Sequence, residues 1–208
     1  MSGDRERIMV KKNSLLYRSF KDSIGRMLVE FDWGELHLDC EGTCTYQDGS
    51  LYSGFYKAGH FHSMGTFTWP DGTRYEGQWK DGLPHMLGTM VLPDGHRYEG
   101  EWRNGNAEGE GTETLPDGGK YTGQWISGLK SGKGEMVFAD GKRYVGQWKE
   151  DLMHGMGKLF FSDGSRYEGV WEKNNVHGRG SMIFWDGKTE RTHKGEWIEN
   201  KFKVTEIL

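Results

Sequence analysis

The chain has 208 residues, a formal net charge of -4 and two cysteines. The small negative charge argues against a dedicated nucleic-acid-binding protein, which normally carries a strong basic excess, and two cysteines are too few for a disulfide framework. Because the sequence has no apolar run of about 18 residues and Met1–Val10 is too polar for a signal peptide, we expect a cytoplasmic protein.

The N-terminal segment, residues 1–28, is basic and precedes the regular part of the chain. Apolar side chains recur at helical spacing within residues 14–30, at Leu16, Phe20, Ile24, Met27 and Leu28. This pattern predicts a short helix, although Gly25 disfavours one. Such a helix could lie on a membrane or in a groove of another protein, but capping the open edge of a sheet is the interpretation we favour.

From there on the sequence is periodic. Asp-Gly recurs seven times at an unbroken spacing of 23 residues, at positions 48, 71, 94, 117, 140, 163 and 186. A fixed period of this length is typical of stacked repeats. Residues 29–51 form a degenerate half repeat, residues 52–192 form six repeats that end in a three-residue insertion, and residues 193–208 form a partial repeat and a C-terminal cap.

Each repeat is predicted to contain two short strands, because extended alternation is bounded by glycine-rich turns. In Pro70–Gly72, proline supplies the fixed φ of a type I turn and glycine supplies a positive φ. A two-residue Asp-Gly loop is the alternative, and it would place Phe67 opposite Glu76. A three-residue loop places Phe67 opposite Tyr75 and keeps the apolar side chains on one face, so we predict that loop. The expected fold is all-β, an elongated single antiparallel sheet of stacked 23-residue hairpins.

The two faces of this sheet are predicted to differ. One face, the aromatic face, carries the Tyr and Trp columns together with residues such as Phe67 and Trp69. The opposite, polar face carries residues such as Arg74, Glu76 and Gln78. Stacked hairpins form a continuous aromatic ladder that one hairpin could not bury alone, and at about 4.8 Å between strands the array should be roughly 60 to 70 Å long.

The repeated residues resemble the MORN repeat (membrane occupation and recognition nexus). Matching features are the Tyr-x-Gly-x-Trp opening, a following glycine, a His-Gly pair at residues 154–155 and 177–178, and Gly-x-Gly before the Asp-Gly loop. Asp151 and Asn174 replace glycine, which is a mild departure because both residue types tolerate the left-handed conformation. Further departures are Tyr56, Ser63, Met86 and His193. The resemblance implies an elongated, twisted single sheet without an attached catalytic domain.

No candidate catalytic, cofactor or metal site emerges from these residues. Four histidines share one repeat position, but neighbouring repeats are about 10 Å apart, too far for them to bind one ion. These histidines are His62, His85, His154 and His177. His37, Cys40 and Cys44 lie close in sequence, yet Cys44 occupies a position that is apolar in other repeats. The serines and histidines are all repeated structural positions, so we expect no enzyme activity and no cofactor.

Two features of the polar face are candidate binding sites. A basic column precedes each repeat tyrosine and could contact an anionic lipid surface, although glutamates on the same face should neutralise it, so weak membrane contact at most is expected. This column is Arg74, Arg97, Lys120, Arg143 and Arg166. In the C-terminal half the same face becomes apolar, which predicts a contact for a protein partner, either a second copy of the chain or another protein. This partner cluster is Val137, Val145, Phe160, Val170 and Ile183.

Three functions are consistent with these features. The first is a non-enzymatic scaffold that binds other proteins in a cytoskeletal assembly, which the resemblance to stand-alone MORN proteins of cilia and flagella implies, most of all to radial spoke components of the axoneme. The second is a peripheral membrane adaptor for acidic phospholipids, and the third is a regulatory subunit of an enzyme on another chain. The first hypothesis is favoured.

Overall fold

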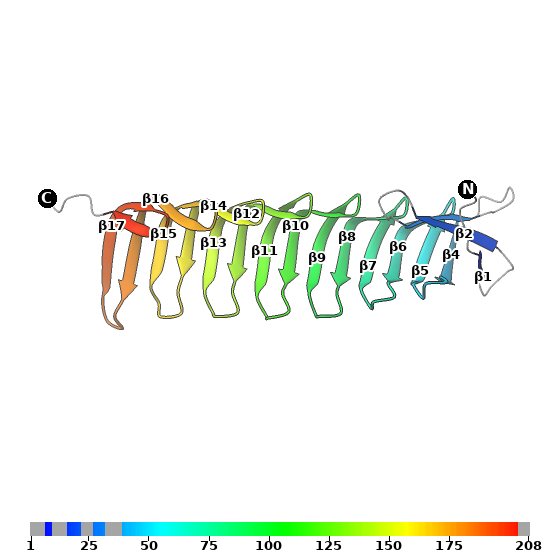
Figure 1. Ribbon diagram of the computed structural model, residues 1–208, viewed down its shortest axis with the longest axis horizontal. Coiled ribbons are helices and arrows are strands. Elements are labelled where there is room, and N and C mark those ends of the chain that lie inside the picture. The colour runs from blue at the N-terminus through cyan, green and yellow to red at the C-terminus, as the bar shows by residue number, and fades with distance from the viewer. Residues whose placement is uncertain (1–6, 10–15, 22–26, 32–38, 204–208) are drawn as a thin grey trace. The chain divides into compact units, whose positions relative to one another are not determined.

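The computed structural model describes residues 7–9, 16–21, 27–31 and 39–203, which fall into two compact units, Met1–Asn106 (unit 1) and Ala107–Leu208 (unit 2). In unit 1 the strands that carry the repeats follow one another in chain order, and Figure 1 shows β5 to β9 side by side with hairpin loops along both edges. These strands are β4 (Cys40–Thr45), β5 (Leu51–Lys57), β6 (His60–Thr68), β7 (Arg74–Lys80), β8 (Leu83–Val91) and β9 (Arg97–Arg103).

Unit 2 repeats this arrangement, because each strand again pairs antiparallel with its chain neighbours. Its strands are β10 (Asn106–Thr114), β11 (Lys120–Ile126), β12 (Leu129–Val137), β13 (Arg143–Lys149), β14 (Leu152–Phe160), β15 (Arg166–Glu172), β16 (Asn175–Trp185), β17 (Glu190–Ile198) and β18 (Lys201–Lys203). The predicted all-β fold of stacked antiparallel hairpins is therefore confirmed in both units.

The Asp-Gly loops have the predicted three residues. Trp69 donates its backbone N–H to the Thr73 carbonyl at 2.8 Å, and Gly72 adopts a φ of 89°. The Asp71 carboxylate accepts the Thr73 N–H at 2.8 Å, which fixes the turn from within. Phe67 consequently lies opposite Tyr75, so the register predicted from the sequence is confirmed.

Two-residue loops connect the hairpins at the other edge of the sheet. Lys80 pairs with Leu83, and the two residues between them, Asp81 and Gly82, have φ values of 50° and 80°. Positive φ at both positions is the signature of a type I′ turn, whose twist matches that of the strands it joins. Asp151 and Asn174 hold the second position of such loops with φ values of 66° and 68°, so both residues do adopt the left-handed conformation.

Asp151 also adds a hydrogen bond that glycine cannot make. Its backbone N–H donates to the Lys130 carbonyl at 3.1 Å, and its carboxylate accepts the Lys130 N–H at 2.8 Å. The same reciprocal pair joins Asn174 to Met153 and Asn200 to Val176. In unit 2 each of these loops is thus tied by two bonds to the start of the strand that follows the preceding two-residue loop.

A β-bulge interrupts the second strand of the repeats that begin at Tyr52, Tyr75, Tyr121, Tyr144 and Tyr167. In β8 the pairing passes from Gly88 opposite Gly77 to Pro84 opposite Trp79, so three residues of β8 face the single residue Gln78 of β7. Met86 lies in this bulge with a φ of 54°. The equivalent positions in unit 2 are glycines with φ values from 61° to 68°, namely Gly109, Gly132, Gly155 and Gly178.

The buried core is the aromatic ladder. Tyr75 is fully buried and Trp79 nearly so, and their rings meet edge to face at 4.8 Å. The tyrosine ring crosses the paired glycines Gly77 and Gly88, where any side chain would overlap it, and its hydroxyl donates to the Gln78 carbonyl at 2.9 Å. The glycines thus accommodate the tyrosine of their own repeat, and the same pattern is found around Tyr52, Tyr121, Tyr144 and Tyr167.

The predicted N-terminal helix is wrong for the described residues. Leu16–Lys21 and Met27–Phe31 are strands β2 and β3, which pair antiparallel with each other, and β1 (Arg7–Met9) pairs with β2. Leu16, Phe20 and Leu28 fit a helical spacing, but short hairpin strands accommodate the same residues, and Gly25 disfavours a helix by about 1 kcal/mol relative to alanine. Because β1 contacts β4, this small sheet lies next to the edge strand of the repeats.

Candidate protein-binding surfaces

The aromatic face of unit 2 contains an apolar cavity of about 540 Å³. Three phenylalanines that share one repeat position, Phe138, Phe161 and Phe184, contribute to its lining. Among the other lining residues are Tyr167 and Trp171, which belong to the buried ladder. The remaining lining residues are Asp140, Lys142, Met153, Leu159, Asn174, Val176, Met182, Trp197 and Asn200.

Several polar side chains of the lining are already bonded within the protein, whereas the buried indole N–H groups of Trp171 and Trp197 make no hydrogen bond. Asn174 and Asn200 accept backbone N–H groups at 2.8 and 2.7 Å, and the Lys142 ammonium pairs with Asp140 at 2.8 Å. The cavity therefore offers mainly aromatic and aliphatic contact, which suits the apolar side chains of a protein or peptide.

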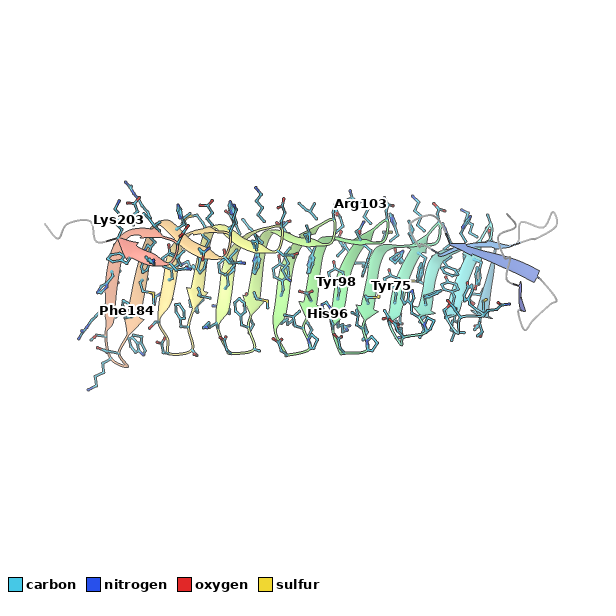
Figure 2. All side chains as sticks on the ribbon, in the orientation of Figure 1. Tyr75, His96, Tyr98, Arg103, Phe184 and Lys203 are labelled. Atoms are coloured by element: carbon cyan, nitrogen blue, oxygen red, sulfur yellow. The ribbon has the colours of Figure 1, made fainter. Side chains whose placement is uncertain are left out.

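A longer hairpin forms one wall of this cavity. The three-residue insertion lets β16 and β17 pair beyond the usual end of the strands, so that Phe184 lies opposite Arg191 and Trp185 opposite Glu190. Phe184 is 41% exposed and Trp185 is 45% exposed, unlike the aromatic residues of the ladder. Figure 2 places Phe184 and Lys203 at opposite edges of the sheet in unit 2, with Phe184 at the edge of this hairpin.

The sequence did not predict this cavity. We expected the aromatic face to be internal ladder and looked for the partner on the polar face. Two sequence features could have indicated it. One is the three-residue insertion after Thr189, and the other is the phenylalanine at position 184, which continues the column of Phe138 and Phe161 into the last hairpin.

On the polar face, the predicted partner cluster alternates with arginines. Arg143 lies between Val137 and Phe160, and its guanidinium stacks on the Phe160 ring at 4.4 Å. Arg166 likewise pairs with Phe160 on one neighbouring strand and with Ile183 on the other. Val137 is 39% exposed, whereas Ile183 is only 7% exposed and offers little contact area.

The two valines of the cluster are half-buried on the same face. Val145 lies opposite Glu135 and Lys158, so charged side chains flank it. Val170 lies opposite Met156, which is 60% exposed. The cluster is thus a mixed surface rather than a continuous apolar strip, and its role in partner binding stays a prediction.

Four members of the basic column are paired with carboxylates. Arg166 makes the most extensive contact, and the carboxylates of Glu190 and Glu168 raise its pKa. The ion pairs are Arg74 with Glu76 at 2.7 Å, Arg97 with Glu99 at 2.6 Å, Arg143 with Glu135 at 3.2 Å, and Arg166 with Glu168 at 3.0 Å and Glu190 at 2.7 Å. These pairs reduce the positive potential that the column could offer an anionic surface.

One ion pair lies on the aromatic face. The Lys130 ammonium is 2.6 Å from the Glu113 carboxylate, both side chains are at most 15% exposed, and the ammonium lies over the Tyr121 and Trp125 rings at 5.4 and 5.3 Å. Apolar residues hold both positions in the next repeat, so this charge pair distinguishes one place in the ladder. The sequence pattern alone did not single it out.

The residues considered for metal binding are dispersed. Within the described ranges no three His, Cys, Asp or Glu side chains are grouped closely enough to hold an ion. Cys44 is 2% exposed and burial raises its thiol pKa to about 12, in line with a buried structural position, while His37 lies outside the described residues. No helix of the described residues is long and apolar enough to cross a membrane.

A family model described as the MORN repeat matches six consecutive segments, residues 52–74, 75–97, 98–120, 121–143, 144–166 and 167–189. No curated protein sequence matches the chain. Among solved structures, the TCP domain of Drosophila melanogaster SAS-4 (dCPAP), in complex with a proline-rich motif of Ana2 (dSTIL), is 11% identical with a TM-score of 0.46, covering 85% of this chain and 88% of that chain. A streptogramin B lyase is 9% identical with a TM-score of 0.20, covering 94% of this chain and 84% of that one.

Proposed function

Because the chain belongs to the MORN-repeat family, whose repeats commonly mediate protein or membrane interactions, we propose that it is a non-enzymatic scaffold that binds other proteins. The observation that carries this proposal is the apolar cavity on the aromatic face of unit 2. A concave surface of this size, lined mainly by aromatic and aliphatic side chains, can take up the apolar side chains of a partner.

The polar-face cluster around Phe160 is the second proposed contact. Its ring is already covered on one side by Arg143, so a partner would meet a stacked arginine and the exposed Val137 side by side. Arginine and aromatic residues are enriched where proteins bind each other, which supports this surface as a site for a second copy of the chain or for another protein.

A membrane adaptor is the weaker alternative. Four of the five basic residues in the column already bind a carboxylate on the same face. Each unpaired basic residue near an anionic membrane contributes about 1 kcal/mol, and a neutralised column contributes much less. We therefore expect weak contact with acidic phospholipids at most.

We further propose that the scaffold acts in a cytoskeletal assembly, with a cilium or flagellum axoneme as its location. The resemblance to stand-alone MORN proteins of cilia and flagella is the only support for this location. Imaging the tagged protein in ciliated cells tests it directly. A diffuse cytoplasmic signal, together with a protein that does not co-sediment with axonemes, would contradict the location but would not bear on the protein-binding function.

A photo-crosslinking experiment in native cells tests the protein-binding function and separates the two faces. The crosslinking amino acid replaces Phe184 in the cavity wall, Phe160 on the polar face, or Ile126, which is 58% exposed and lies in neither surface. We expect a discrete crosslinked protein from position 184, and the same or a second one from position 160. If only the Ile126 control captures proteins, or if all three give the same smear, the proposed sites are wrong.

A substitution then measures the importance of the cavity. Phe184→Asp inserts a charge into the apolar wall while the exposed side chain leaves the fold largely intact, so we expect loss of the crosslinked partner with an unchanged melting temperature. Full retention of the partner by Phe184→Asp together with its loss in Phe160→Asp would place the site on the polar face instead.

A further inference from the structure

Three neighbouring apolar side chains on unit 1 are more exposed than the apolar residues around them. Met64 is 57% exposed, Met86 is 58% exposed and Leu87 is 60% exposed. All three lie at the bulges of β6 and β8, away from the aromatic core, and we call them the Met-Leu patch. Methionine is common at binding surfaces because its flexible side chain adapts to different partners.

Gln78 on β7 is the centre of this patch. Met64 lies directly opposite Gln78, and Leu87 lies on the following strand, opposite Glu101 on the polar face. The Met86 side chain also starts beside Gln78. In the repeat numbering Gly178 is the equivalent of Met86 and Val170 is the equivalent of Gln78, and a Cβ atom at Gly178 would lie 3.6 Å from Val170. The three apolar side chains therefore form one row across β6, β7 and β8.

The fold offers no reason for a methionine at position 86. Its φ is 54°, a conformation that is unfavourable for any residue with a Cβ, and the equivalent residues of unit 2 are glycines. The side chain gains little burial in return, since more than half of it is exposed. An exposed apolar side chain held in a strained backbone conformation is a candidate for a role in binding.

A basic row runs alongside the Met-Leu patch. Lys57, Lys80 and Arg103 share one repeat position on β5, β7 and β9, and all three are exposed. Lys80 is two residues along β7 from Gln78 on the same face, about 7 Å away. Figure 2 shows Arg103 at the edge of the sheet opposite to that of His96 in an Asp-Gly loop. In unit 2 the equivalent residues are Ile126, Lys149 and Glu172, which form no basic row.

The spacing of both rows matches an α-helix laid across the strands. Residues of one row lie two strands apart, which is about 10 Å, and seven residues of helix span about 10.5 Å. A helix crossing β6 to β8 would therefore place successive i and i+7 side chains over Met64 and Leu87. Residues on the adjacent side of the same helix would face Lys57, Lys80 and Arg103 at the same interval.

We propose that the Met-Leu patch binds an amphipathic helix of a partner protein, with an apolar heptad stripe over the patch and acidic residues toward the basic row. Charge favours this occupant over a membrane. Glu76 and Glu99 lie on the same face, on the side of the patch away from the basic row, and a flat anionic membrane would meet them as well. A helix about 10 Å wide that covers the patch and the basic row leaves these two glutamates uncovered, although Glu101, opposite Leu87, borders the patch. This surface lies in unit 1 and is independent of the cavity in unit 2.

Two synthetic helical peptides and the full chain test this inference. Both peptides carry the same leucine heptad stripe, flanked by glutamate in one and by lysine in the other, and binding is followed by fluorescence anisotropy. We expect the glutamate peptide to bind and the lysine peptide to bind at least about tenfold more weakly. The double variant Met64→Ser with Leu87→Ser should lose about tenfold or more in affinity, whereas Met156→Ser, equally exposed but in unit 2, should lose none.

Met86→Gly separates binding from folding. Removing this side chain relieves the left-handed backbone, so the melting temperature should rise, while affinity for the glutamate peptide should fall. Equal binding of both peptides, an equal loss in Met156→Ser, or unchanged affinity in Met86→Gly would each overturn the proposal. Sedimentation with phosphatidylcholine–phosphatidylserine vesicles that the Met64 and Leu87 variant abolishes would make the occupant a membrane and overturn it too.

Discussion

Replacing Gly134 by alanine should remove the tyrosine of its own repeat from the core. A Cβ at position 134 would lie 2.6 Å from Cζ of Tyr121, which is fully buried and donates its hydroxyl to the Gln124 carbonyl at 3.0 Å. The ring cannot stay, so the variant loses the burial of an aromatic side chain, about 3 to 5 kcal/mol, and about 1 kcal/mol more for the hydrogen bond. For a protein of this size a loss of about 4 to 6 kcal/mol should lower the melting temperature by roughly 8 to 24 °C.

Gly128→Ala is the matched control for this prediction. Gly128 has a φ of 83° and open space around it, so an added methyl group should cost only the backbone penalty of about 1 to 2 kcal/mol. Gly134 lies outside the left-handed region, so its substitution carries no such backbone penalty, but the added methyl group overlaps the Tyr121 ring. Urea unfolding followed by tryptophan fluorescence measures both variants. If Gly134→Ala loses no more stability than Gly128→Ala, the tyrosine ring does not fill the space above the glycine pair as we describe.

Trp125→Ala should cost about 3 to 5 kcal/mol in the same assay, because the side chain is 5% exposed, and a loss no larger than that of Glu101→Ala would show that the tryptophan column is not structural. Burial raises the pKa of Tyr167 from 10.0 to about 12, so between these pH values the folded chain keeps a proton that the unfolded chain releases. The contribution of Tyr167 to stability should be full below pH 10 and fall as the pH rises toward 12, and Tyr167→Phe should make that fall shallower. Little protein should co-sediment with phosphoinositide liposomes. Tight, salt-sensitive co-sedimentation that is lost in the triple variant Arg74→Ala, Arg97→Ala and Arg143→Ala would favour the membrane adaptor.

The sequence was sufficient to predict the strands of the repeats and their register at the Asp-Gly loops. One misplaced residue would have moved Phe67 to the wrong face, and that requirement alone selected the three-residue loop. The β-bulge was not predicted, although the sequence holds three residues between Pro84 and Gly88 against one between Gly77 and Trp79. Comparing these two residue counts, three against one, would have indicated the bulge.

The N-terminal segment and the cavity were beyond pattern reasoning for different reasons. A few apolar residues at Leu16, Phe20 and Leu28 are compatible with a helix and with a short hairpin, and only pairing partners decide between them. The cavity depends on the sizes of side chains from several strands and on how far the last hairpin extends. Residues such as Phe184 could be placed on a face from the sequence, but the empty volume beside them could not.

The reciprocal hydrogen bonds at the two-residue loops make the early and late loops of this edge unequal in local opening. In unit 2 the N–H groups of Lys130, Met153 and Val176 each donate to an Asp or Asn side chain of the next loop. In unit 1 the equivalent loop residue opposite Phe61 is Gly82, which donates its own N–H but has no side chain to return the bond. Amide hydrogens at this edge should therefore exchange with solvent sooner in the first repeats than in the last, so that copies of one motif open at different rates along a single chain.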